Sequence, residues 1–224
     1  MLNPVLTSFL ISDIIFLITG GILIAAACIW KSELASPATT ESVGRLILLQ
    51  GCPLSAVIAN GIIVGVTFLI SLPAFALPTS RTWLKIHSWG VVICMVFTLC
   101  LGLNEWIQTL TTRANLEVLW GQQSDLTQSM LQQKFDCCGY INSTTPHYVP
   151  DATCTNDIVA ASKEGCIGAF STYGSTWLGY LFTAAFGVVG MDMVMLLCTA
   201  MLIRYRKEQL RYRLIDQKWG VGSI

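Results

Sequence analysis

Charge is scarce in this chain of 224 residues. Lysine and arginine together number 13, aspartate and glutamate also number 13, and the formal net charge is zero. A surface that binds DNA or RNA needs clustered basic residues interleaved with aromatic ones, and the basic residues here show no such arrangement, so we expect no nucleic-acid partner. The low charged fraction of 12%, set against 54% apolar residues, is typical of a membrane protein.

Residues that carry catalysis or bind metals are also few. The two histidines, His87 and His147, are too isolated in the sequence to predict an acid–base pair, and no hydrolase serine motif occurs. Zinc would need a better ligand pattern, because there is no Cys-X-X-Cys knuckle and adjacent cysteines fit tetrahedral ligation poorly. We therefore expect no catalytic residue, no metal site and no enzyme activity.

Long apolar runs, in contrast, are abundant. Four runs approach the length of about 20 residues with which an α-helix crosses about 30 Å of hydrocarbon. They cover residues 9–30, 57–77, 87–106 and 178–203. The end of the first run resembles the cleavage site of a leader peptide. No basic residue precedes this run, so we expect that it is not cleaved and forms the first span. The predicted fold is an all-α membrane protein with a bundle of four transmembrane helices.

Basic residues predict which loops lie outside. They concentrate in the short loop 78–86 and in the tail 204–224, and they are sparse in the loops 31–56 and 107–177. Because cytoplasmic segments carry the excess of lysine and arginine, the N-terminal segment 1–8 and the tail are both expected in the cytoplasm. The first outer loop is then small and the second one large.

Cysteines indicate a scaffold in the large outer loop. Four of the nine cysteines lie there, namely Cys137, Cys138, Cys154 and Cys166. Successive Cα atoms lie only about 3.8 Å apart, so Cys137 and Cys138 are not expected to bond to each other. Two pairings stay open: Cys137 with Cys166 and Cys138 with Cys154, or the crossed alternative. Asn142 opens an Asn-Ser-Thr acceptor for glycosylation, which would require the same oxidising, secretory compartment.

A helix is predicted over residues 124–135, just before these cysteines. Ser124 or Asp125 would cap its N-terminus, and Gly139 would supply the positive φ of a sharp turn after its end. Its apolar residues are expected on one buried stripe: Leu126, Met130 and Phe135.

Three acids lie in or at the edge of the predicted spans: Asp13, Glu105 and Asp192. A charged side chain is costly there, which makes each acid a candidate functional group. We expect Asp13 and Asp192 to face the bundle interior with at least one of them protonated, because two nearby carboxylates in a low dielectric do not easily both ionise. Hydrogen bonds between helices are favoured over binding of a lipid hydroxyl. A transporter or channel that uses the three acids as an ion path is the alternative, and the scarcity of polar residues in the spans disfavours it.

Two further features concern packing and the tail. Small residues predict close contact between the first two spans: Gly20, Gly21, Ala25, Gly61 and Gly65. In the tail, Tyr212 and Ile215 of the stretch YRLI resemble a tyrosine-based signal for an endocytic adaptor. Cys198 is the best candidate for palmitoylation, although a buried position is the favoured interpretation for it.

The cysteine motifs resemble those of one known family. Four spans, a small first and a large second outer loop, CCG at 137–139, PDATC ending at Cys154 and EGC ending at Cys166 are together similar to the tetraspanins. A claudin-like junction protein would instead carry its cysteines in a large first outer loop. The resemblance is to a four-cysteine member, and it implies the pairs Cys137–Cys166 and Cys138–Cys154.

The same resemblance implies a function and its sites. It implies a membrane scaffold that assembles laterally with other integral membrane proteins, including other tetraspanins, and with lipids. Partner choice would lie in the spans and in the variable segment from Tyr140 to Gly165, while the segments 104–120 and after Cys166 would be helical. No cofactor is implied, although in some members an intramembrane pocket holds a sterol, which Asp13 and Asp192 would face here.

Location and process are expectations from resemblance as well. Such a protein is expected in the plasma membrane or in the endosomal or vacuolar system. The short chain and compact variable segment resemble small fungal tetraspanins, a group linked to polarised growth and to host penetration.

Overall fold

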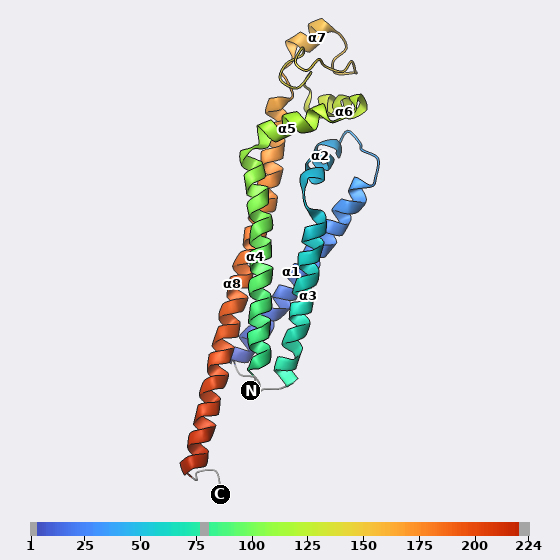
Figure 1. Ribbon diagram of the computed structural model, residues 1–224. Helices are drawn as coiled ribbons and strands as arrows, with labels where there is room; N and C mark the ends of the chain where they lie inside the picture. The colour runs from blue at the N-terminus through green and yellow to red at the C-terminus, as the bar shows by residue number, and fades with distance from the viewer. Residues whose placement is uncertain (1–3, 77–80, 220–224) are drawn as a thin grey trace. The chain divides into compact units, whose positions relative to one another are not determined.

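A computed structural model of the chain describes residues 4–76 and 81–219. These residues form helices and no regular strand, with only isolated bridges between residues 142 and 147. The helices are α1 (Pro4–Leu34), α2 (Val43–Gly51), α3 (Leu54–Ala76), α4 (Thr82–Leu110), α5 (Thr112–Gly121), α6 (Asp125–Phe135), α7 (Asp157–Ser162) and α8 (Ile167–Trp219) (Figure 1). The prediction of an all-α fold is confirmed.

The chain divides into two compact units. The bundle unit comprises Met1–Cys28, Ser55–Leu101 and Ala185–Ile224. The loop unit comprises Ile29–Leu54 and Gly102–Ala184. Helices α1, α4 and α8 each contribute residues to both units.

In the part of the chain that the structure describes, four helices are long and apolar enough to cross a membrane. They are Pro4–Leu34, Leu54–Phe75, Thr82–Leu110 and Ile167–Lys218. The last of them belongs to α8, whose 53 residues correspond to about 80 Å of helix. α8 therefore extends well beyond its apolar run and includes most of the predicted tail, for which the sequence predicted no helix.

Within its membrane-length helices, the bundle unit buries several polar residues and exposes large apolar ones. Its core joins side chains from α1, α3, α4 and α8: Phe9, Phe16, Val64, Ala74, Leu84, Val91, Cys94, Met195 and Leu202. Large apolar side chains cover its surface, as Ile11, Leu69, Ile93 and Leu197 show. Such a surface matches the hydrocarbon of a bilayer, in which exposed polar groups are costly.

Close approach of α1 and α3 depends on two of the expected small residues. A Cβ atom on Gly20 would lie 2.5 Å from Cγ1 of Val64, and one on Gly61 would lie 2.9 Å from the carbonyl oxygen of Gly20. A Cβ atom on Gly21 or Gly65 would meet nothing within 4 Å. The expected packing role is therefore wrong for Gly21 and Gly65, because these glycines point away from the neighbouring helix.

The loop unit has a core of its own. It combines residues of α2, α5 and α6, the first disulfide and the start of α8: Val43, Ile47, Leu48, Leu116, Trp120, Leu131, Cys137, Tyr140, Cys166 and Phe170. Helix α2 lies within 31–56, where the sequence predicted only a loop. Its nine residues are too few to show a clear period, and it is held by burial of its apolar face rather than by its own propensity.

Helix α6 begins and ends where the sequence predicted, at the boundary with the two adjacent cysteines. Ser124 is the N-cap, and its hydroxyl accepts a hydrogen bond from the backbone N–H of Thr127 at 3.4 Å. The left-handed residue that ends α6 is Asp136, with φ of 51°, and not Gly139. Gly139, with φ of 71°, makes the turn after the two adjacent cysteines, so its predicted positive φ is confirmed.

The buried face of α6 also differs from the expected stripe. Leu126 is 69% exposed, so its predicted burial is wrong. Met130 and Phe135 are half-buried against the core, and the fully buried residues are Leu131 and Gln132. Gln132 can be buried because its side chain is hydrogen-bonded at every polar position.

Candidate functional site

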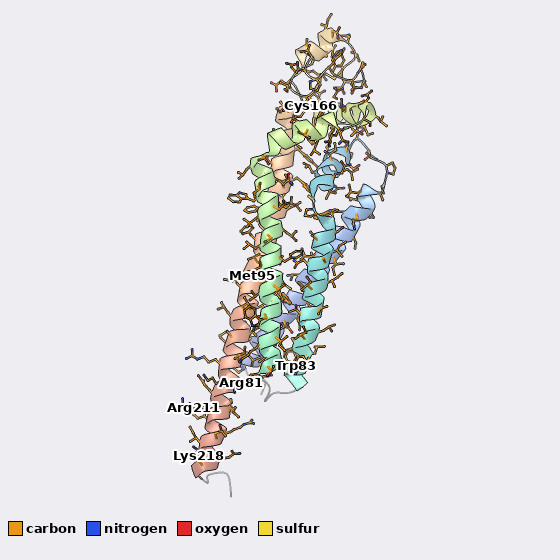
Figure 2. The ribbon with its side chains drawn as sticks, viewed as in Figure 1. Arg81, Trp83, Met95, Cys166, Arg211 and Lys218 are labelled. Atoms are coloured by element: carbon orange, nitrogen blue, oxygen red, sulfur yellow. A yellow bond between two sulfur atoms is a disulfide. The ribbon has the colours of Figure 1, made fainter. Side chains whose placement is uncertain are left out.

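Two disulfides hold the segment between α6 and α8. Cys137 is bonded to Cys166, with Cα atoms 5.0 Å apart, and Cys138 is bonded to Cys154, with Cα atoms 5.9 Å apart. All four cysteines are buried. These pairs are the two that the family resemblance implies. Cys166 precedes the first residue of α8 and is labelled in Figure 2.

The two bonds anchor this segment to different cores. The Cys137–Cys166 bond lies in the helical core of the loop unit, together with Tyr140 and Phe170. The Cys138–Cys154 bond lies in a smaller cluster with Tyr148 and Ala160. Adjacent cysteines thus point into two cores, which is why the sequence places them side by side.

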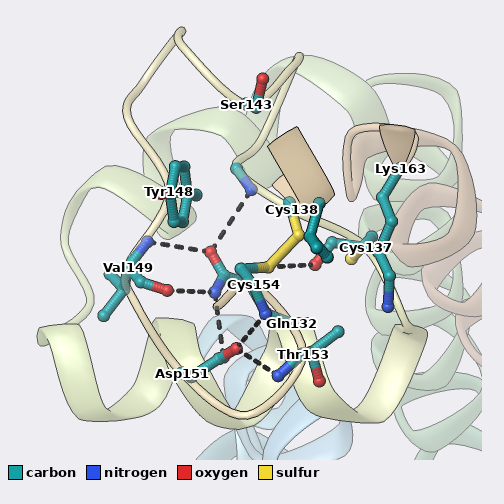
Figure 3. The surroundings of a disulfide bond; sticks show 12 residues. Gln132, Cys137, Cys138, Ser143, Tyr148, Val149, Asp151, Thr153, Cys154 and Lys163 are labelled. Carbon is teal, nitrogen blue, oxygen red and sulfur yellow. Dashed lines mark hydrogen bonds between the residues drawn. A yellow bond between two sulfur atoms is a disulfide. The ribbon is translucent and has the colours of Figure 1, made fainter. Parts of the chain in front are cut away.

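Gln132 joins α6 to the second disulfide region (Figure 3). Its Nε2 donates to the carbonyl oxygen of Val149 at 2.7 Å and to Oδ2 of Asp151 at 3.0 Å. Its Oε1 accepts from the N–H groups of Gly139 and Val149 at 3.3 and 3.1 Å. The side chain is fully buried and uses both of its donors and both acceptor positions. Sequence reasoning missed this residue, because a glutamine on a polar helix gives no local sign of burial.

Asp151 completes the same network through its other oxygen. Oδ1 accepts from the backbone N–H groups of Thr153 at 2.8 Å and Cys154 at 2.7 Å. This turn is the PDATC stretch, and it presents Cys154 to Cys138. The aspartate is therefore structural, and its charge is satisfied by backbone donors.

We predict that Gln132→Leu loosens residues 149–154 without unfolding the rest of the chain. Loss of a buried four-bond network leaves backbone groups of Val149 and Gly139 unpaired, which should cost about 2 kcal/mol or more. Hydrogen exchange on the full-length protein should show faster exchange at 149–154. Gln133→Leu is the matched control, because Gln133 is the exposed neighbour on the same helix. Equal exchange in both variants would show that the network does not hold this segment.

The segment from Tyr140 to Gly165 presents two exposed isoleucines. Ile141 is 45% exposed, and Ile158, on the short helix α7, is 84% exposed. The hydroxyl of Tyr148 donates to Oδ1 of Asp157 at 2.8 Å and fixes the start of α7. This hydrogen bond raises the pKa of Tyr148 above its usual range. A rigid segment thus holds apolar side chains in water.

Asn142 lies at the surface of the same segment. Its Oδ1 accepts hydrogen bonds from the N–H groups of Thr144 at 3.0 Å and Thr145 at 2.7 Å, which form a tight turn. The residue is exposed, and its glycosylation stays a prediction.

The bundle unit contains a buried polar cluster that involves three helices. Oδ1 of Asp13 on α1 lies 3.3 Å from Nε2 of His87 on α4. The hydroxyl of Ser71 on α3 donates to Oδ2 of Asp13 at 2.5 Å. At most 1% of each of these three side chains is exposed. The interpretation of His87 as isolated is therefore wrong: it is paired with an acid that is far away in sequence.

Aromatic rings enclose this pair and keep water away. The ring centroids of Phe9 and Phe16 lie 5.7 and 6.4 Å from that of His87, both in edge-on geometry. The pair places a carboxyl group and an imidazole next to each other in a site with almost no access to solvent. Because Asp13 lies on α1 and His87 on α4, this polar contact joins the two helices inside the bundle unit.

Asp192 is placed differently from Asp13. It is 1% exposed on α8, and its Oδ2 has no hydrogen-bond partner among the described residues. Burial of both aspartates agrees with the expected inward orientation. Within the described residues, Asp13 accepts a hydrogen bond from Ser71 and lies beside His87, and no contact with Asp192 is found. Protonation of at least one aspartate stays a prediction.

A second polar contact joins α3 to α4. Nδ2 of Asn60 donates to Oγ1 of Thr98 at 2.7 Å, and both side chains are buried. The two polar groups satisfy each other in a region where the bilayer supplies no water to bond them. The sequence analysis did not identify either residue.

Glu105 belongs to the loop unit, whereas Asp13 and Asp192 belong to the bundle unit. It is 8% exposed, and its Oε2 accepts a hydrogen bond from the thiol of Cys52 at 3.7 Å. Burial, and then the nearby carboxyl, raise the pKa of Cys52 well above its usual range. The structure therefore gives no support to one ion path through all three acids.

The tail residues and Cys198 have contrasting environments. Tyr212 and Ile215 are exposed on the same part of α8, so both are accessible for an adaptor. Cys198 is buried, and its sulfur lies 3.3 Å from the hydroxyl oxygen of Ser12. A buried thiol of this kind does not favour palmitoylation.

Comparison with known proteins identifies the family of this chain. A model of the tetraspanin family matches residues 5–205, which is most of the chain. Comparisons with curated proteins and with solved structures find no match. Tetraspanins are multi-pass membrane proteins that generally associate with other membrane proteins in a scaffold role and are generally not enzymes. With four membrane-length helices, disulfides between the third and the fourth, and this match, the chain belongs to the tetraspanin family.

Proposed function

We propose that this protein organises lateral assemblies of membrane proteins and that residues 140–165 choose the partners. The observation that carries the proposal is Ile158, a large apolar side chain that is 84% exposed on a segment held by two disulfides. Rigid apolar residues lose little conformational freedom on binding, so they are efficient anchors for a partner. Other tetraspanins and unrelated integral membrane proteins are the proposed partners.

The test introduces one negative charge at position 158. Ile158→Asp should reduce co-purification of partners in mild detergent about ten-fold or more, because a hot-spot residue contributes about 2 kcal/mol. Leu126→Asp is the control, since Leu126 is 69% exposed in the same unit and lies outside residues 140–165. Partners are quantified by mass spectrometry after purification from native membranes. The same loss in both variants, or no loss in either, would refute recognition by this segment.

The proposal includes an orientation. Both termini lie in the cytoplasm, and the loop unit lies outside or in a secretory lumen, where its disulfides form and Asn142 is glycosylated. In sealed vesicles, protease should remove the end of α8 only from the cytoplasmic face. Enzymatic deglycosylation should shift the mass only if Asn142 is intact.

Lipid contacts and location complete the proposal. The cluster of Asp13, Ser71 and His87 mainly joins helices, while the buried Asp192 is the group left to bond a sterol hydroxyl. We place the protein in the plasma membrane or the endosomal or vacuolar system, with Tyr212 and Ile215 as an adaptor signal. Polarised growth or host penetration is the proposed process.

A further inference from the structure

The part of α8 beyond its apolar run carries a basic groove. Six charged residues line it: Arg81, Arg204, Lys207, Glu208, Arg211 and Lys218. Leu210, Leu214 and Ile215 add an apolar part to the same groove. Arg81, Arg211 and Lys218 are labelled in Figure 2.

Helix geometry brings these cations together. Arg204, Lys207, Arg211 and Lys218 follow one another at intervals of three, four and seven residues, so they share one face of α8. Arg81 comes from a different segment, directly before α4. The groove therefore combines cations from two segments that are far apart in the sequence.

Other contacts keep this face in place. The guanidinium of Arg206 donates to the carbonyl oxygen of Ala74 on α3 at 2.7 Å, which attaches α8 to the bundle just beyond its apolar run. Arg213 lies on the same helix but does not line the groove, so not every basic residue of the tail belongs to this site.

The groove has an excess of positive charge. Its one acid, Glu208, lies 3.6 Å from Nε of Arg204, and both side chains are largely exposed, so this ion pair is weak. In the described part of the chain, Lys207 and Arg211 form no ion pair. Mutual repulsion of these cations would be relieved best by a ligand that carries several negative charges.

We propose that this groove binds the headgroup of a membrane lipid with more than one phosphate, that is, a phosphoinositide. Arg204 directly follows the apolar run of α8, so the groove begins at the membrane surface, where anionic lipids are concentrated. Guanidinium groups bind phosphate oxygens in pairs, and the apolar residues suit the glycerol end of a lipid. The inference rests on the proposed cytoplasmic orientation of the tail.

The test uses the full-length protein in nanodiscs of neutral phosphatidylcholine. Binding of a fluorescent phosphatidylinositol bisphosphate is measured against phosphatidylserine at equal total charge. Neutralising Arg81, Lys207 or Arg211 with glutamine should weaken phosphoinositide binding about five-fold each, and the triple variant about a hundred-fold. Arg213→Gln removes one charge from the same helix outside the groove and should change binding less than two-fold.

Two outcomes would overturn the proposal. One is equal binding of phosphatidylserine with equal effects of Arg81→Gln and Arg213→Gln, which would indicate attraction to any anionic surface. The other is displacement of the lipid by an equimolar amount of free inositol trisphosphate, which would indicate a soluble ligand. The protease test of orientation is separate, so failure of lipid binding with a cytoplasmic tail would refute the groove alone.

Discussion

Replacing His87 with leucine should destabilise the bundle unit by about 3 kcal/mol. The substitution leaves Asp13 buried without its basic partner, and only the hydroxyl of Ser71 remains to bond it. Asp13→Leu should have a similar effect, because it leaves an imidazole unpaired in an apolar site. Thermal unfolding in a fixed detergent gives both values.

The double variant makes this prediction specific. Asp13→Leu combined with His87→Leu should cost less than the sum of the single changes, by about 2 kcal/mol or more, because no unpaired group remains. Asn60→Leu combined with Asp13→Leu is the control pair, since Asn60 bonds Thr98 instead. Additive values for Asp13 and His87 would show that the two side chains do not stabilise each other.

Removing the Cys137–Cys166 bond should destabilise the loop unit more than removing the Cys138–Cys154 bond. Replacing both cysteines with serine opens a loop with a sequence separation of 29 and should cost about 3 to 4 kcal/mol. Serine hydroxyls would also be buried in the helical core beside Tyr140 and Phe170. We expect faster hydrogen exchange throughout α2, α5 and α6.

The other disulfide should have a more local effect. Replacing Cys138 and Cys154 with serine opens a shorter loop, with a separation of 16, whose cluster involves Tyr148 and Ala160. Faster exchange should then be confined to about residues 140–165. Cys100→Ser is the control, because Cys100 is an exposed free cysteine. Equal disruption by both double variants would contradict the assignment of the two bonds to different cores, as would recovery of crossed disulfide peptides by mass spectrometry.

The sequence was a good guide wherever the signal is local. A span is a continuous run of apolar residues, so its existence follows from composition over about 20 residues. The CCG triplet and the spaced cysteines are equally local, and they led to the correct family. The N-cap of α6 was limited to Ser124 or Asp125 in the same way, because a capping residue acts on the next three residues, and the structure assigns it to Ser124.

Sequence reasoning failed where a residue's role depends on distant partners. Gln132 is buried because Val149 and Asp151 satisfy it, and Leu126 is exposed because α6 turns that partnered face inward. Helix α2 forms because the loop-unit core buries its apolar residues. The buried face of α6 and the existence of α2 were therefore not visible in the sequence of either segment.

The sequence by itself determined that this chain crosses a membrane several times and carries a cysteine-linked loop between its third and fourth spans, because hydrophobic length and motif spacing are properties of neighbouring residues. Only the tertiary structure decided that Asp13 meets His87 and Ser71, and that Arg81 joins the basic face of α8. Those contacts join residues on different helices. Their geometry depends on how the helices pack, which no short stretch of sequence encodes.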